Sequence, residues 1–189
     1  MCNTDLEGGA LVLGPGEWHA CDLHLPDNTI LYGAAGPNTT HIVCHEEISE
    51  ACLEGEEACP VAHTLLMGHG SALIGVDINT HIDLPDTGDV PIVALHGAQS
   101  MLNHVRIKGS WNSVGVEVFI DDAQEAENTI TLQHVTLDTH RIGVHVRSPE
   151  PGVANYETLT LHVVDSVLSW MGNAVVQDAT EGDTPTVIP

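Results

Sequence analysis

Glu117 and His145 are the residues whose types and spacing best suit acid–base chemistry. They occupy the same position in two similar phrases of the chain, Val-Gly-Val-Glu-Val and Ile-Gly-Val-His-Val. A carboxylate and an imidazole that meet at one surface can serve as general acid and general base, for example on a polysaccharide. The same pattern arises when Glu and His pair across neighbouring solvated strands without catalysis. Both interpretations stay open.

Arg147 and a set of aspartates indicate a second chemistry, calcium binding beside a cationic base. Arg147 follows the second phrase, and Asp121, Asp122 and Asp178 fall in equivalent turns. Carboxylate oxygens are ligands that Ca²⁺ prefers. The alternative is a surface ion pair between Arg147 and one of these acids. If the chain is an enzyme, its candidate catalytic residues are Glu117, Asp121, Asp122, His145 and Arg147.

Two tryptophans offer a surface on which a sugar ring could stack. Trp111 and Trp170 each follow a strand phrase, so we expect them at turns of different repeats. Ligand sites are commonly lined by aromatic side chains. The alternative is that each ring packs over the edge of its own turn, with no shared platform.

Cysteines indicate a disulfide more than a metal site. None of the five forms a Cys-x-x-Cys pair, which argues against a zinc ribbon or a thioredoxin-like site. Disulfides would suit an extracellular compartment, whereas free buried thiols are the alternative. The odd count leaves at least one thiol unpaired within a monomer. The cysteines that we consider for pairing are Cys21, Cys44, Cys52 and Cys59.

The charge of the chain excludes several partners. The sequence has 27 acidic residues against four Lys and Arg, a net charge of −23. Such a chain repels nucleic acid and anionic membrane surfaces. No apolar run is long enough to insert into a membrane. The charge favours divalent cations, high salt or a basic partner, and 189 residues suffice for a single domain with its own core.

The elements that position these residues come from a repeat. Val76 and Val105 are 29 residues apart, and Val105 and Val135 are 30 apart, each within a short strand phrase. A second strand recurs some ten residues later in each repeat, and three of the four second strands contain Gly. Short strands at this period, without a helical return, predict the coils of a parallel β-helix. The four first-strand phrases begin at Leu73, Leu102, Leu132 and Leu159.

Alternation along the second strands predicts which side chains enter the core. Val116 and Val144 should point inward, whereas Glu117 and His145 should point outward to solvent. The acidic, Cys-containing segment 45–62 lacks this alternation and is predicted to be a loop insert. The last residues, 179–189, are predicted to be a polar tail of the single domain 1–189.

The opening segment resembles a known family. Residues 13–43 contain the phrases Leu-Gly-Pro-Gly-Glu-Trp, Leu-Pro-Asp-Asn and Gly-Ala-Ala-Gly-Pro-Asn-Thr-Thr. These phrases are similar to the first coils of the pectin-lyase-like superfamily. The resemblance implies a right-handed parallel β-helix with coils of about 22–30 residues. It implies fold alone, since that superfamily contains lyases, hydrolases, epimerases, tailspikes, adhesins and non-catalytic proteins.

His104 and His134 depart from the family pattern. In that superfamily the residue before the repeated Val is often Asn, and the Asn side chains stack from coil to coil, whereas this chain has His. Neighbouring coils lie about 4.8 Å apart, so the two rings are expected to stack as a structural ladder. A metal site or a pH-sensitive pair is the alternative.

The polygalacturonases of this superfamily provide a test for catalytic motifs. They carry Asn-Thr-Asp, Asp-Asp, Gly-His-Gly and Arg-Ile-Lys, in that order. This chain contains Gly68-His-Gly70, Arg106-Ile-Lys108 and Asp121-Asp122, in a different order, and no Asn-Thr-Asp. Ile107 also falls on a core position of the repeat. We therefore interpret these matches as coincidental.

These observations favour a non-catalytic β-helix module, extracellular or on a cell or virion surface, used for structure, self-assembly or attachment. The alternative is a polysaccharide-active lyase or hydrolase that uses acidic residues of the outer face. No cofactor is expected to be required, and calcium is the candidate ion. The expected partner is another copy, in a homo-oligomer or by end-to-end stacking, with polysaccharide as the alternative. Nucleic acid and membrane insertion are not expected.

Overall fold

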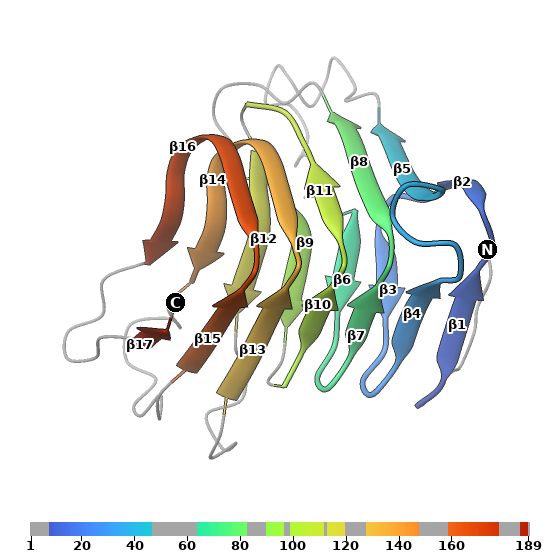
Figure 1. The fold of residues 1–189 in the computed structure, drawn as a ribbon, viewed down its shortest axis with the longest axis horizontal. Helices are drawn as coiled ribbons and strands as arrows, with labels where there is room; N and C mark the ends of the chain where they lie inside the picture. Colours follow the sequence, from blue (N-terminus) through green and yellow to red (C-terminus); the bar gives the residue numbers. More distant parts are fainter. Residues whose placement is uncertain are drawn as a thin grey trace, which may run out of the picture.

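The chain folds into a right-handed parallel β-helix (Figure 1). The computed structural model describes residues 8–46, 64–82, 90–96, 99–111, 113–119, 128–147, 159–177 and 186–188. All regular elements in these residues are strands, and they pair in parallel. The predicted all-β solenoid is confirmed. Among the described residues, no helix has the length and apolar character needed to cross a membrane.

The first face of the β-helix is a sheet of seven strands. Each of these strands begins a turn of the solenoid, and they stack in sequence order from the N-terminal to the C-terminal end (Figure 1). They are β1 (Ala10–Leu13), β4 (Ile30–Gly33), β7 (Ala72–Ile74), β10 (Met101–Asn103), β13 (Asn128–Gln133), β15 (Leu159–Val164) and β17 (Thr186–Ile188).

The second and third faces merge into one ten-stranded sheet, because β14 and β16 continue around the corner between them. The second face comprises β2 (Gly16–His19), β5 (Thr40–Glu46), β8 (Asp77–Ile82), β11 (Arg106–Lys108) and the first parts of β14 (Thr136–Val146) and β16 (Val167–Gln177). The third face comprises β3 (Leu23–Leu25), β6 (Leu65–Met67), β9 (Val90–His96), β12 (Ser113–Phe119) and the last parts of β14 and β16.

The pairing of the first face gives the length of each coil. A row of leucines, direct partners on neighbouring strands, lies at positions 11, 31, 73, 102 and 132. The successive intervals are 20, 42, 29 and 30 residues. The long second coil includes residues 47–63, which are outside the described residues. The predicted insert 45–62 falls there, apart from its first two residues, which end β5.

The register predicted for the last repeat is wrong by four residues. Leu132 pairs with Val163, not with Leu159. Three alternate residues of β15, Leu159, Leu161 and Val163, are apolar, so alternation alone allows three registers. The turn after the strand selects one of them. Asp165 there adopts a positive φ of 47°, like the residues that end the corresponding strands of earlier coils.

That turn recurs between the first and second faces. Gly75, His104, His134 and Asp165 follow β7, β10, β13 and β15, and all have φ between 47° and 68°. His, Asp and Asn are the non-glycine residues that tolerate the left-handed region best. A bend of this kind redirects the chain from one face to the next. The backbone conformation therefore explains why these residue types occupy the turn.

The core consists of stacked rows of aliphatic side chains. On the second face Ile42, Ile78 and Ile107 are direct partners and at most 1% exposed. On the third face Val116 and Val144 are both 0% exposed, which confirms their predicted inward orientation. Burial of an aliphatic side chain contributes about 1.5–3 kcal/mol. Because each row repeats in every coil, the burial accumulates along the axis.

Candidate functional site

The structure brings together three of the predicted catalytic candidates. Glu117 on β12 and His145 on β14 are direct partners on the third face. Glu117 Oε2 lies 3.9 Å from His145 Nδ1 and 3.6 Å from Arg147 Nε. Glu117 and His145 hold matching positions in two similar phrases, and the strand pairing puts the carboxylate beside both a ring nitrogen and a cation.

The prediction that Glu117 and His145 face solvent is wrong. Glu117 is 3% exposed and His145 is 7% exposed. Alternation does direct them away from the core row of Val116 and Val118, but it does not determine what passes over the outer side of a sheet. Glu117 and His145 are therefore enclosed polar groups on the outer side of the third face.

Burial changes the chemistry that this cluster can perform. A general acid or base must come within hydrogen-bond reach of its substrate. The Glu117 carboxylate is enclosed, and its Oε2 accepts no hydrogen bond from the described residues, with Arg147 and His145 beyond hydrogen-bond distance. Arg147 is half exposed and offers the nearest positive charge. The arrangement suits an internal ion pair that joins two coils.

The remaining charged candidates are not placed by the structure. Asp121, Asp122 and Asp178 lie outside the described residues, so calcium binding by them stays a prediction. Within the described part of the chain, no group of three or more His, Cys, Asp or Glu side chains is arranged to hold a metal ion.

The two candidate tryptophans occupy different kinds of position. Trp111 lies in the turn between β11 and β12, at a turn as predicted, and is 59% exposed. Trp170 lies within β16, close to the corner that this strand makes, and not in a turn. The reason is that β16 continues without a break from the second face to the third. Its side chain is not among those described.

His104 and His134 lie on adjacent coils with their rings in contact. The ring centroids are 4.5 Å apart, and the rings are tilted by 47°. The backbone N–H of His104 donates to the Gln133 carbonyl at 3.0 Å, which continues the stack of coils through the turn. His104 Nδ1 also lies 2.6 Å from Asn103 Oδ1. Ring contact and backbone bonding together support a structural role for the pair.

The Gly-His-Gly phrase packs against the preceding coil. The backbone N–H of His69 donates to Asp27 Oδ1 at 2.8 Å. A Cβ on Gly68 would lie 2.3 Å from the same carboxylate oxygen, so a larger residue does not fit without movement. Asn28 N also donates to the His69 carbonyl at 2.7 Å. These contacts explain the phrase as a tight turn.

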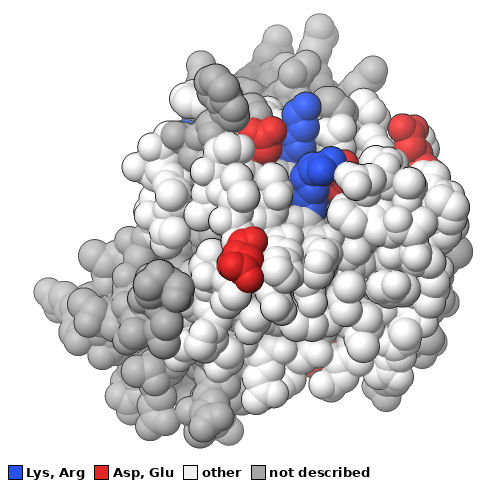
Figure 2. Space-filling view, in the orientation of Figure 1, with Lys and Arg blue, Asp and Glu red and all other residues white. Residues whose placement is uncertain are grey.

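Charged residues gather in the outward row of the second face. Asp77 on β8 is the direct partner of His41 on β5 and of Arg106 on β11. Its Oδ2 lies 3.3 Å from His41 Nδ1 and 3.6 Å from Arg106 Nη1. Arg106 Nη2 also donates to Asn38 Oδ1 at 3.3 Å. Figure 2 shows the basic side chains over β11 with acidic atoms on either side. The row is a cross-strand ion-pair ladder on an accessible surface.

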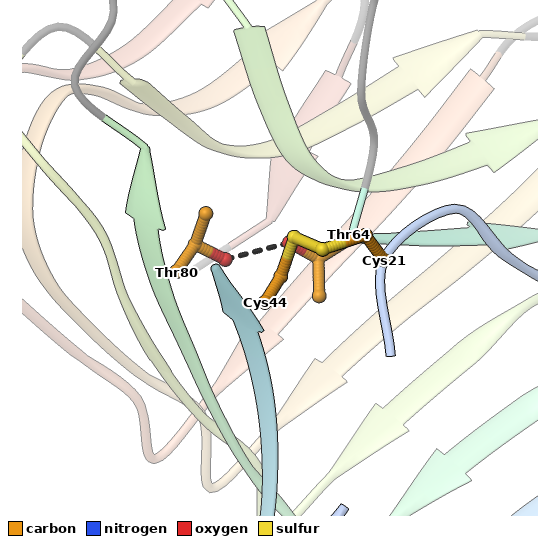
Figure 3. Close-up of a disulfide and its surroundings, with 4 residues drawn as sticks. All are labelled: Cys21, Cys44, Thr64 and Thr80. Carbon is orange, nitrogen blue, oxygen red and sulfur yellow. Dashed lines mark hydrogen bonds between the residues drawn. A yellow bond between two sulfur atoms is a disulfide. The ribbon is translucent and has the colours of Figure 1, made fainter. Parts of the chain in front are cut away.

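A disulfide joins the first two coils. Cys21, after β2, is bonded to Cys44 on β5 (Figure 3). Beside it, Thr64 and Thr80 share a buried hydrogen bond of 2.6 Å. The disulfide pins Cys44 to the coil before it, and not to the acidic insert that follows. Cys52 and Cys59 lie outside the described residues.

A buried Ser–His pair was not predicted from the sequence. Ser113 Oγ lies 2.8 Å from His140 Nδ1, and His140 Nε2 lies 3.2 Å from the Ile107 carbonyl. The Ile107 carbonyl can only accept, so Nε2 carries a proton. Ser113 Oγ also lies 2.7 Å from the Ser110 carbonyl, so its single hydroxyl hydrogen goes either to that carbonyl or to Nδ1. His140 is 0% exposed, which leaves the pair without access to a substrate. It braces the corner where β14 turns from the second face to the third.

Burial lowers the pKa of His140, while its bond to the Ile107 carbonyl and the Asp138 charge raise it by less. The folded pKa is thus below the unfolded value of about 6.5. We expect the contribution of His140 to stability to be complete above that pH and lost as pH falls below it, by up to about 1.4 kcal/mol per pH unit. Unfolding free energies of the wild type and His140→Gln, measured from pH 7.5 to 5.5, should converge on acidification.

The exposed His24 provides the control for that prediction. His24→Gln makes the same substitution at a position where the side chain is exposed in the folded protein. The unfolding free energy of each variant is compared with that of the wild type at the same pH, because protonation of carboxylates affects all of these proteins alike. A constant difference between His140→Gln and the wild type across this range would contradict the expected role of burial.

Comparisons with known proteins give no family for the chain. No protein-family model matches it, and neither a curated protein nor a solved structure is significantly similar to it.

Proposed function

We propose that the chain is a non-catalytic β-helix module that serves in structure or attachment and assembles with copies of itself. The observation that carries this proposal is the long edge strand β16, which has a partner on one side only among the described strands. This strand has 11 residues, and among the described strands it pairs with β14 alone. An edge strand of this length offers a row of backbone groups for pairing with another chain.

The side chains at this end support the same conclusion. Val144 and Val175 are partners in one core row, yet Val144 is 0% exposed and Val175 is 39% exposed. At the other end of the solenoid, Trp18 pairs with the core residue Ile42 and is 44% exposed. A head-to-tail contact between copies would cover both ends and would continue the coil from one copy to the next.

We expect Val175→Lys to prevent this assembly, because a charge in the open core row cannot be buried against another coil. Light scattering of the wild type over a range of protein and salt concentrations should show a mass that rises beyond that of a dimer as concentration increases. Val175→Lys should form nothing larger than a dimer under the same conditions. Thr136→Lys, which adds the same charge on the outward row of the second face, is the matched control and should assemble like the wild type. A wild type that never exceeds the mass of a dimer would refute the proposal.

The alternative of a polysaccharide lyase or hydrolase is favoured by one observation, the meeting of Glu117, His145 and Arg147. Their burial weighs against it. We expect no turnover on a panel of neutral and acidic polysaccharides, with or without calcium. Turnover that Glu117→Gln abolishes, in a variant that retains the melting temperature of the wild type, would establish the enzyme instead.

We further propose an extracellular or cell- or virion-surface location and membership of the pectin-lyase-like superfamily. The Cys21–Cys44 disulfide supports the location, since such bonds persist mainly in oxidising compartments. The parallel β-helix and the phrases of residues 13–43 support the superfamily. No cofactor is required in this proposal. Calcium stays the candidate ion, and a lower melting temperature in chelator would identify it as structural.

A further inference from the structure

The first face is uncharged although the chain is highly acidic. None of the residues in its seven described strands is Asp, Glu, Lys or Arg, whereas the whole chain has 27 acidic residues. The first face therefore differs in charge from the other sheet of the same molecule. The strands of the other sheet contain charged residues of both signs: Glu17, Glu46, Asp77, Arg106, Lys108, Glu117, Asp138 and Arg141.

The outward side of this face is apolar toward both ends of the solenoid. At the N-terminal end, Val12 is 58% exposed, Ile30 40% and Tyr32 42%. At the C-terminal end, Val164 is 40% exposed. The pairing of the strands places Val12, Tyr32 and Val164 in one outward row. Exposed apolar side chains that line up along one face indicate a contact surface more than scattered ones do.

The middle of the same face mixes apolar and polar side chains. From Tyr32 the outward row continues through Ile74, Asn103 and Gln133 to Val164, and the neighbouring outward row contains Met101, Thr131 and His162. A pocket of about 330 Å³ lies beside these strands, and none of the residues that line it is Asp, Glu, Lys or Arg. The face is therefore apolar over β1, β4 and β7, and mixed over β10, β13 and β15.

We propose that the first face is the contact surface for a second copy of this chain, related by a two-fold axis. Two copies with a net charge of −23 repel each other, and the seven described strands of the first face add no Asp, Glu, Lys or Arg to that repulsion. A basic partner would find no acidic side chain in these strands. In an antiparallel pair the apolar N-terminal strands of one copy face the Val164 end of the other, and β10 of each copy lies near the axis, as an isologous contact requires.

The size of the face determines the strength of this contact. Seven strands about 4.8 Å apart span about 29 Å, and the strands have three to six residues each. Such an area lies at or below the lower end of specific interfaces, which bury about 800 Å² per partner. The dimer should thus be weak and dependent on concentration. This contact is independent of the head-to-tail contact proposed at β16, because it uses the side of the solenoid.

The test uses the Val175→Lys variant, in which the end contact is absent. Sedimentation equilibrium should show a monomer–dimer equilibrium at high protein concentration. Adding Val12→Lys and Tyr32→Lys should raise the dissociation constant at least tenfold. Any added Lys reduces the net charge and hence the general repulsion, so weaker association can come only from loss of the contact. His19→Lys with Val167→Lys, outward on the second face, is the control of equal charge and should not weaken the dimer.

A second measurement checks the two-fold geometry. Met101 lies on β10, the fourth of the seven strands, so the two copies of this residue should lie near the axis. Met101→Cys should form covalent dimers on mild oxidation at a rate well above that of the parent, whereas Val12→Cys, at the end of the face, should not. Equal effects of both Lys pairs, or no dimer at any concentration, would overturn the proposal. Binding of a neutral polysaccharide to this face in a strictly monomeric protein would also overturn it.

Discussion

Replacing Ile107 with alanine should destabilise the protein by about 2–5 kcal/mol, the cost of removing a large aliphatic side chain from a close-packed core. Ile107 is 0% exposed and lies between Ile78 and Leu137 in the core row of the second face. A cavity there loses contacts with the coil on each side, and the stacked rows leave little freedom to close it. Chemical denaturation monitored by circular dichroism would measure the change in unfolding free energy.

Lys108, the next residue, provides the control and tests whether the Arg-Ile-Lys phrase has a structural role. Lys108 points outward and is exposed, so Lys108→Ala should change the unfolding free energy by less than about 0.5 kcal/mol. A structural phrase predicts this large asymmetry between Ile107 and Lys108. If Ile107→Ala were as stable as the wild type, the placement of β11 in the core row would be wrong.

Removing the Cys21–Cys44 disulfide should cost about 3 kcal/mol, the loop entropy expected for a bond that closes a loop of this length. The two cysteines are 23 residues apart in the sequence and join the first coil to the second. Among the described strands, those of the first coil pair on one side only, so this coil depends on the disulfide more than an inner coil would. The unfolding free energy of Cys21→Ala with Cys44→Ala, compared with that of the wild type, measures the effect.

Single variants and reductant provide the controls for that loss. Cys21→Ala alone should lose as much as the double variant, because either change removes the same bond. Reductant should lower the stability of the wild type toward that of the double variant and leave the double variant unchanged. Two small and additive losses would instead show that the cysteines contribute as separate buried thiols.

Much of the fold follows from local patterns. Alternation in the phrases around Val116 and Val144 identifies the core side of each strand, because side chains in a strand alternate between its two faces. The spacing of Leu73, Leu102 and Leu132 gives the coil period, since in-register stacking requires equivalent residues at equal intervals. These features depend on residues that are close together in the sequence.

The candidate site was only partly predictable. The contact between Glu117 and His145 could be predicted from their matching positions in two phrases, because strands that pair in register bring equivalent residues side by side. Burial was not predictable, since alternation gives the side of the sheet on which a side chain lies and not the neighbours that enclose it there. His140 was missed for a different reason. It lies where β14 turns a corner, and there the alternation that identifies inward residues no longer applies.

The sequence by itself determined that this chain forms a parallel β-helix, which residues make its core, and that Glu117 and His145 share a position on adjacent coils. Only the tertiary structure decided the register of β15, the Cys21–Cys44 bond, the burial of the charged cluster and the gathering of seven described strands without Asp, Glu, Lys or Arg on one face. The physical reason is that alternation and period are local properties of the chain. Disulfide partners, enclosure and a shared surface depend on which distant segments the coils bring together.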